Sequence, residues 1–314
     1  MPFLAGFDAR WPDVGSYLAA LIQDLDEARR LDLFAEHLSP EVVSHDGLGA
    51  LAEPEVLGAE LAARAAALTG ARLLTEERIW QATAQNAFVA AERFHVTARH
   101  DGAGLYGPPT RRKLRFTQMS ERYCVAGQLR EQWVLRDEAA ILAQIGVDVM
   151  QGARWRLADA PRAGFEPRPA GPGNGSPWGA ALAGLLARVM DGELAAVAQY
   201  DPAAELVLPG GETGCGPRDA ETFWLGLRAA FPSARFEIDH ALGAEEPLTA
   251  PRACLRWSLT GNHDGHGAFG TPTGAPVRIL GMTQAEFGPD GLRREWTLYD
   301  VPGVWAQILR AAGG

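Results

Sequence analysis

The chain contains a long internal repeat. When the sequence is shifted by 163 positions, His100 falls on His263, and the alignment continues without a gap to Ile145 on Ile308. Of these 46 positions 17 are identical, whereas unrelated sequences of ordinary composition would share about three. Solenoid units recur every ~20 to 50 residues, so a shift this long indicates duplication of a whole domain. We therefore expect two copies of one fold.

A segment rich in proline and glycine separates the two copies. It reads PRAGFEPRPAGPGNGSP from Pro161 to Pro177 and carries almost no periodic apolar signal. The total length of 314 residues also suits two domains that can each bury a core. We predict a first domain over residues 1–157, a linker over 158–176 and a second domain over 177–314.

The order of predicted elements is the same in both copies. Each begins with an amphipathic helix, over Tyr17–Leu38 and Trp178–Tyr200, and a second helical stretch follows near 55–68 and 219–230. The rest alternates as β-strands, which we place at Arg72–Gln81, Ala87–Arg99, Arg112–Val125 and Leu129–Arg136, with counterparts at Arg235–Leu242, Ala253–Gly261, Pro276–Phe287 and Leu292–Tyr299. Helices followed by antiparallel strands predict an α+β fold.

Composition argues against several classes of partner. The net charge of -10 opposes attraction to phosphate backbones, so we expect no nucleic-acid partner. No apolar run approaches the roughly 20 residues of a membrane span, and the first residues lack a signal-peptide pattern. Three scattered cysteines fit neither a disulfide framework nor a metal site. These features predict a cytoplasmic protein without a membrane partner.

The repeated segment has a recognisable pattern. It reads His-x-Gly-x-x-x-(Tyr/Phe)-Gly-x-Pro-Thr, then a strand and a turn near Gly127 or Gly291, then Leu-Arg-x-x-Trp-x-Leu-x-Asp before a helix ending in Gln-Ile. Over His100–Gly146 and His263–Leu309 this pattern resembles the SnoaL-like polyketide cyclase family of the nuclear-transport-factor-2-like superfamily. The resemblance implies two tandem cone-shaped domains. Each would be a curved antiparallel sheet with N-terminal helices over its concave face.

The same resemblance implies an acid–base pair that this sequence lacks. In the cyclases an aspartate follows the position of Trp133 or Trp296, and a histidine lies on the neighbouring strand. Here the residues after the tryptophans are Val134 and Thr297, and the neighbouring-strand positions align with Ser120 and Thr283. None of these side chains titrates near neutrality.

Glu295 is the remaining candidate for proton transfer. Strand alternation puts Glu295, Thr297 and Tyr299 on one face, which the family geometry would turn towards the cone. A carboxyl in an apolar cone would have its pKa raised by desolvation. The alternative is a solvated carboxylate at the rim. Because the first copy has Gln132 in place of Glu295, we expect the second cone to be the more polar, more open and more active one.

The loop Asn-His-Asp-Gly-His-Gly offers a further candidate. His263 is our third predicted catalytic residue beside Glu295 and Tyr299. The glycines of this loop favour the alternative that it is a plain turn between strands. A metal site is the weaker alternative, because the spacing of His263, Asp264 and His266 matches no strong template. We predict neither a metal nor a cofactor.

The remaining predictions concern ligand, packing and caps. We expect a small apolar or aromatic ligand, contacted by Thr297, Thr283, Trp224, His266, Gln132, Tyr123 and Trp80. Trp133 and Trp296 should cover the convex sheet faces and pair the two domains within the chain, with association into homo-oligomers left open. Asp137 and Asp300 should cap helices. A non-catalytic binding or scaffolding protein is the rival to an enzyme.

Overall fold

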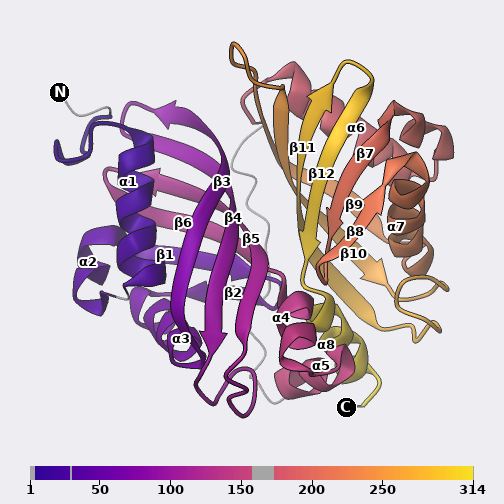
Figure 1. The fold of residues 1–314 in the computed structure, drawn as a ribbon, viewed down its shortest axis with the longest axis horizontal. Coiled ribbons are helices and arrows are strands. Elements are labelled where there is room, and N and C mark those ends of the chain that lie inside the picture. The colour runs from indigo at the N-terminus through magenta and orange to yellow at the C-terminus, as the bar shows by residue number, and fades with distance from the viewer. Residues whose placement is uncertain (1–3, 29, 158–172, 314) are drawn as a thin grey trace. The chain divides into compact units, whose positions relative to one another are not determined.

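The computed structural model describes residues 4–28, 30–157 and 173–313. These residues form two compact units, each built on one six-stranded sheet (Figure 1). The first unit holds the described residues up to Val134 together with Ile141–Val147. The second holds Leu135–Ala140, the described residues after Val147 and the chain from Gly173 onward. The predicted tandem α+β fold is confirmed.

Both sheets have the same strand order. The first is β2-β1-β6-β5-β4-β3, and the second is β8-β7-β12-β11-β10-β9. In the first sheet the strands are β1 (Leu38–Asp46), β2 (Gly49–Ala52), β3 (Leu68–Ala84), β4 (Ala87–His100), β5 (Lys113–Val125) and β6 (Gln128–Arg136). In the second they are β7 (Tyr200–Leu208), β8 (Glu212–Cys215), β9 (Arg235–Ala244), β10 (Arg252–Asn262), β11 (Pro276–Gly288) and β12 (Gly291–Tyr299).

The sheets are mixed, which corrects the expectation of purely antiparallel sheets. β1 pairs with β6 in parallel, and β7 pairs with β12 in parallel, while the other neighbours are antiparallel. The parallel strands β1 and β7 begin at Leu38 and Tyr200, the last residues of the two predicted N-terminal helices, and the rest of each strand was not predicted. A parallel pair needs a crossover, which here is made by a helix and the strands that follow it.

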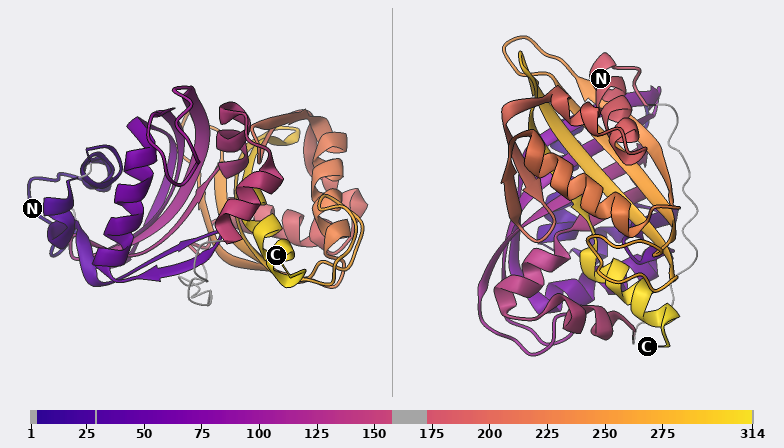
Figure 2. Two further views of the ribbon diagram at one scale, coloured as in Figure 1. Left: turned by 90° about the horizontal axis from the view of Figure 1, so that it is seen from below. Right: turned by 90° about the vertical axis from the view of Figure 1, so that its right-hand side faces the viewer.

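Helices cover one face of each sheet (Figure 2). The first unit has α1 (Val14–Leu21), the π-helical η1 (Ile22–Glu27), the short η2 (Leu31–Leu33), α2 (Phe34–His37) and α3 (Pro54–Ala67). In the second unit they are α6 (Pro177–Met190), η3 (Leu194–Gln199) and α7 (Gly216–Ala230). The predicted helix over Trp178–Tyr200 stops early because Gly192 adopts a left-handed φ of 88° directly after α6.

Identical residues of the repeat tie each last helix to its sheet. The first copy ends in α4 (Glu138–Ile145) and α5 (Val149–Leu157), and the second in α8 (Val301–Ala311). Gln307 accepts from the backbone N–H of Arg278 at 2.8 Å and donates to its carbonyl at 3.0 Å, and Gln144 holds Arg115 in the same way. The side chains of Asp300 and Asp137 each accept a hydrogen bond from the backbone N–H three residues later in the chain, as predicted for helix caps.

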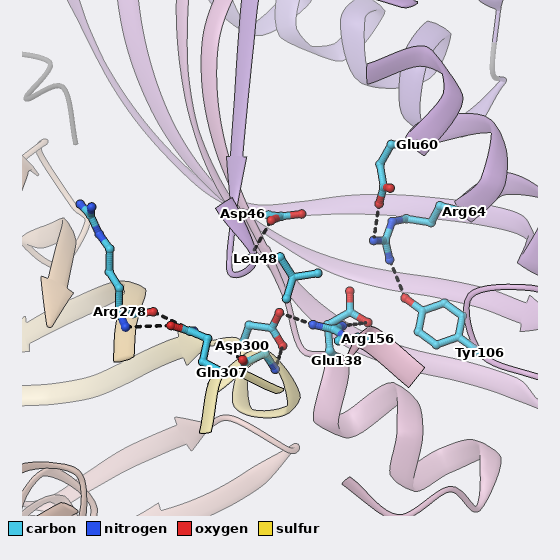
Figure 3. A network of polar contacts seen from close by, with 11 residues as sticks. Asp46, Leu48, Glu60, Arg64, Tyr106, Glu138, Arg156, Arg278, Asp300 and Gln307 are labelled. Atoms are coloured by element: carbon cyan, nitrogen blue, oxygen red, sulfur yellow. Dashed lines mark hydrogen bonds and ion pairs between the residues drawn. The ribbon is translucent and has the colours of Figure 1, made fainter. Parts of the chain in front are cut away.

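The helix α5 belongs to the second compact unit. It contacts α8, and Figure 3 shows its Arg156 between Glu138 and Asp300, with 3.2 Å to Glu138. The predicted first domain, residues 1–157, includes the residues of this helix, because they precede the linker. Residues 158–172 of that linker lie outside the described residues. Its last residues pack on β9, where Asn174 donates to the carbonyl of Gly243 at 2.6 Å.

Candidate functional site

A carboxyl group lies at the centre of the second unit. Glu295 on β12 is only 1% exposed, and Thr297 and Tyr299 on the same strand face are also buried. Trp296, which points the other way, is partly exposed. The alternation of β12 therefore turns Glu295 towards the helix-covered face, as predicted.

Three side chains donate hydrogen bonds to Glu295. Tyr200, the first residue of β7, donates to Oε2 through its hydroxyl. The indole Nε1 of Trp224 on α7 donates to Oε1 at 3.1 Å, and the Thr297 hydroxyl donates to the same oxygen at 2.6 Å. Two strands and a helix thus meet on one carboxyl group.

A second row of hydrogen bonds leads away from Thr297. Thr283 lies opposite Thr297 in the antiparallel register of β11 and β12, and their hydroxyl oxygens are 2.9 Å apart. The indole of Trp257 donates to the Thr283 hydroxyl at 3.0 Å. The two threonines thus face each other at the positions aligned with the cyclase histidine and aspartate.

Burial sets the ionisation of this cluster. Desolvation raises the pKa of Glu295, and the hydrogen bonds from Thr297, Tyr200 and Trp224 offset part of that effect by favouring the carboxylate. Burial, together with the nearby Glu295 carboxylate, raises the pKa of Tyr200 well above its ordinary value. Glu295 is therefore a group that keeps its proton to higher pH than an exposed glutamate does.

An aromatic wall surrounds Tyr299. Its ring centroid lies 6.3 Å from those of Trp257 and Phe223 and 6.5 Å from that of Phe269. Burial raises the pKa of Tyr299, so its hydroxyl stays protonated at neutral pH. The indole of Trp257 lies against Gly281, where any Cβ would overlap the ring. The surroundings of Tyr299 are thus mainly apolar.

A family match covers the strands that carry this cluster. Residues 206–308 match the family model described as SnoaL-like polyketide cyclase. The second unit is a SnoaL-like domain. The first unit repeats its sequence and its strand order, so the chain holds two SnoaL-like domains in tandem. No curated protein sequence matches the chain.

Several solved structures resemble one half of the chain. TsrD from Streptomyces laurentii is 15% identical over 45% of this chain and 99% of its own, with a TM-score of 0.38. AclR from Streptomyces galilaeus is 19% identical over 42% and 94%, with a TM-score of 0.35. A SnoaL-like polyketide cyclase from Agrobacterium tumefaciens is 16% identical over 42% and 97%, with a TM-score of 0.33. The assignment rests on the family match and the repeat.

The loop histidines of the SnoaL-like domains stay outside the Glu295 cluster. His263 is buried, its Nδ1 lies 3.1 Å from the Thr273 hydroxyl, and burial lowers its pKa. His100 makes the same contact with Thr110 in the first domain. These contacts tie each loop together, which fits the turn interpretation. His266 is exposed in the loop and has no contact with the cluster.

The predicted ligand residues of the first SnoaL-like domain do not come together. Gln132 is buried and donates to the Ser44 hydroxyl at 3.0 Å. Tyr123 lies on the opposite face of β5 from the buried Arg122 and Cys124, and Trp80 is 46% exposed beside Phe88. Because successive residues of a strand point to opposite faces, Tyr123 cannot share the face of Arg122 and Cys124.

Two features of the site were missed from the sequence. Tyr200 was assigned to the end of a helix, whereas it begins β7 beside Glu295. In the first SnoaL-like domain, Glu92 and Arg122 form a buried ion pair at 2.6 Å. No sequence pattern links residues so far apart, although a charged residue in an otherwise apolar strand is a usable signal.

The conspicuous tryptophans differ from each other. Trp133 is fully buried and stacks on His45 with ring centroids 5.1 Å apart, whereas Trp296 is only partly buried. Their role in domain pairing stays a prediction. Within residues 4–28, 30–157 and 173–313, no group of three or more metal-ligating side chains is arranged to hold an ion. In that same part of the chain, no helix is long and apolar enough to cross a membrane.

Proposed function

We propose that the second SnoaL-like domain binds a small, mostly apolar, oxygenated molecule and converts it by proton transfer at Glu295, without a metal. The observation that supports this proposal is the buried Glu295 carboxyl, whose pKa is raised by desolvation. Such a group holds its proton to higher pH than an exposed glutamate does and is therefore better suited to donate it to a substrate.

The chemistry follows from the two forms of the carboxyl group. In its protonated form, Glu295 donates to a carbonyl oxygen of the substrate and stabilises an enol. As a carboxylate it takes a proton from the carbon next to that carbonyl. Cyclisation, isomerisation and dehydration of an oxygenated molecule all require one of these steps. The apolar wall around Tyr299 would exclude water from the reacting atoms.

The threonine pair explains how a carboxyl could serve this site without the family aspartate. Thr283 and Thr297 occupy the aligned acid–base positions and cannot carry the proton themselves. Glu295 lies two residues along the same strand face and accepts from Thr297 at 2.6 Å. The carboxyl is therefore supplied from a neighbouring position of β12.

A non-catalytic binding protein is the second candidate. The observation in its favour is that both carboxyl oxygens of Glu295 already accept hydrogen bonds from the protein's own side chains. In this case the cluster would hold β7, β12 and α7 together, and the molecule would bind without reacting.

Exchange of carbon-bound protons separates the two candidates. We expect the protein to accelerate deuterium incorporation into 2-tetralone in D2O, measured by NMR. Glu295→Gln keeps the shape and removes the titratable group, so the catalysed rate should fall roughly 100-fold or more. Glu205→Gln is the control, because Glu205 on β7 is exposed and paired with Arg294.

Two outcomes would contradict proton transfer at Glu295. If 2-tetralone binds and the wild-type protein gives no acceleration, the binding-protein candidate is favoured. An unchanged rate in Glu295→Gln would remove Glu295 from the mechanism.

A further inference from the structure

One asparagine side chain fastens the end of the linker to the edge of the second sheet. β9 is the last strand in the order of that sheet, so its outer edge presents backbone polar groups that need partners. There the Nδ2 of Asn174 donates to the carbonyl of Gly243 at 2.6 Å, and its Oδ1 accepts from the N–H of Gly243 at 3.1 Å. The backbone N–H of Asn174 donates to the carbonyl of Ala241 at 3.3 Å. Asn174 thus satisfies three polar groups of the strand edge.

The contact with Gly243 requires an amide. The Gly243 backbone offers one donor and one acceptor, and only a side chain with both an N–H and a carbonyl oxygen can match them. A carboxylate at position 174 would lose the donor and place an oxygen against the Gly243 carbonyl. The same Oδ1 accepts from the N–H of Ser176 at 3.2 Å, and the Ser176 hydroxyl caps the start of α6. The amide therefore joins β9 to the first turn of α6.

Glycines on both sides make this close approach possible. A Cβ on Gly173 would overlap the carbonyl oxygen of Ala241, and a Cβ on Gly243 would overlap the hydroxyl of Ser176. Gly175 adopts a left-handed φ of 65°, which favours glycine. The segment around Asn174 is therefore closely fitted to β9.

The residue that follows Asn174 makes its amide chemically labile. The chain has three asparagines, and of these Asn86 is followed by alanine, Asn262 by histidine and only Asn174 by glycine. Because glycine has no Cβ, its backbone nitrogen can approach the side-chain carbonyl carbon of the residue before it. An asparagine followed by glycine is therefore the most favourable pair for reaction between side chain and backbone.

The backbone nitrogen of Gly175 is the nucleophile of this reaction. Its attack on Cγ of Asn174 forms a C–N bond, releases ammonia and leaves a succinimide ring. Water then opens the ring at either carbonyl and yields aspartate or isoaspartate, so that the net reaction is hydrolysis of the amide and needs no other reagent. The attack requires the side chain to turn away from Gly243, because both ends of the amide are held there.

We propose that Asn174 and Gly175 form a deamidation site that is protected while Asn174 is bound to Gly243, and that deamidation makes the release of Gly173–Ser176 from β9 permanent. Each local opening of this segment exposes the amide to attack. Aspartate cannot restore the lost donor, and isoaspartate also routes the backbone through the side chain. The site is separate from Glu295 and does not depend on the function proposed for the second domain.

Ageing of the purified full chain at mildly alkaline pH tests the reactivity, because loss of the Gly175 amide proton promotes the attack. Peptide mapping by mass spectrometry should find aspartate and isoaspartate at position 174, while Asn86 and Asn262 keep their amides. Unfolding in urea at the same pH should speed conversion roughly 10-fold or more, since the bonds to Gly243 no longer hold the side chain. Equal conversion at all three asparagines, or equal rates in folded and unfolded chains, would overturn the proposal.

The variant Asn174→Asp reproduces one product and tests the release. Hydrogen exchange at the N–H groups of Gly243 and Ser176 should become about 10-fold faster than in the wild type, the effect of losing one hydrogen bond. Asn86→Asp is the control, because it adds the same charge at an exposed turn and should leave both groups protected. Thermal unfolding shows that both variants are folded. Wild-type exchange at Gly243 in Asn174→Asp would show that deamidation does not release the segment.

Discussion

Glu295 couples the stability of the protein to pH. Its pKa is raised in the folded protein from an ordinary value of 4.5, because burial disfavours the carboxylate. The folded state therefore binds more protons than the unfolded state at any pH between the two values. By linkage, the stabilisation is fully present below the unfolded pKa and is lost as the pH rises through the folded one.

We expect Glu295→Gln to remove this dependence. The free energy of unfolding of the wild type, relative to the variant, should decline as the pH rises above about 4.5. Urea unfolding of both proteins from pH 4 to pH 8 measures the difference. A difference that stays constant, or that grows in favour of the wild type, would contradict the raised pKa.

Single residues were predictable where strand alternation and the repeat act together. The burial of Glu295, Thr297 and Tyr299 follows from the period of two in β12. The partners of Glu295 did not follow, because Tyr200 and Trp224 come from distant segments. Neither hydrogen bond leaves a mark in local sequence, since each depends on how the strands and α7 pack.

At the scale of elements, the pairing of β10 with β11 depends on a size match. Trp257 lies opposite Gly281 in the antiparallel register, while the first copy pairs Phe94 with Gln118. The larger indole in the second copy fills the space over the glycine, where an added Cβ would overlap it. The two positions therefore act as a coupled pair.

We expect Gly281→Ala to destabilise the protein by about 1–3 kcal/mol, because overpacking displaces the indole. Combined with Trp257→Phe, the substitution should cost less than the sum of the two single effects. Gly184→Ala on the exposed face of α6 is the control, since nothing lies near its added Cβ, and it should stabilise by roughly 0.5–1 kcal/mol. Chemical denaturation of all four variants tests this, and strict additivity would show that the pair is not coupled.

Among elements, the strands β3–β6 and β9–β12 were predicted from the sequence, whereas β1, β2, β7 and β8 were not. The matched segment contains β5, β6, β11 and β12, and the alignment of the two copies shows which of their residues correspond. β1, β2, β7 and β8 lie between the predicted helices, in segments for which no element was predicted, and β2 and β8 have only four residues each, too few for a clear period of two. The parallel pairing of β1 with β6 and of β7 with β12 arises from tertiary contacts alone.

At the scale of the whole molecule, the repeat boundary and the boundary of the compact units differ. α5 precedes the linker in sequence, yet it packs on α8 and its Arg156 pairs with Asp300 at the start of that helix. The repeat does not predict the packing of α5, because the described part of the second copy has no helix after α8 that would correspond to it.

A truncation experiment tests the placement of α5. A chain of residues 148–314 should unfold at a higher temperature than a chain of residues 177–314, by about 2–8 °C if α5 contributes 1–2 kcal/mol. Calorimetry measures both midpoints. Substituting Arg156→Ala in the longer chain should remove part of the gain, and equal midpoints for the two chains would show that α5 contributes nothing.

The same placement of α5 has a consequence for the order of synthesis. The ribosome makes α5 before any strand of the second unit, and its partner α8 is among the last segments to appear. At roughly 5–20 residues per second, the ~140 residues between them take on the order of ten seconds or more to translate. Throughout that interval the apolar side of α5 has no α8 to cover it. α5 can therefore dock only after α8 has been made, near the end of translation.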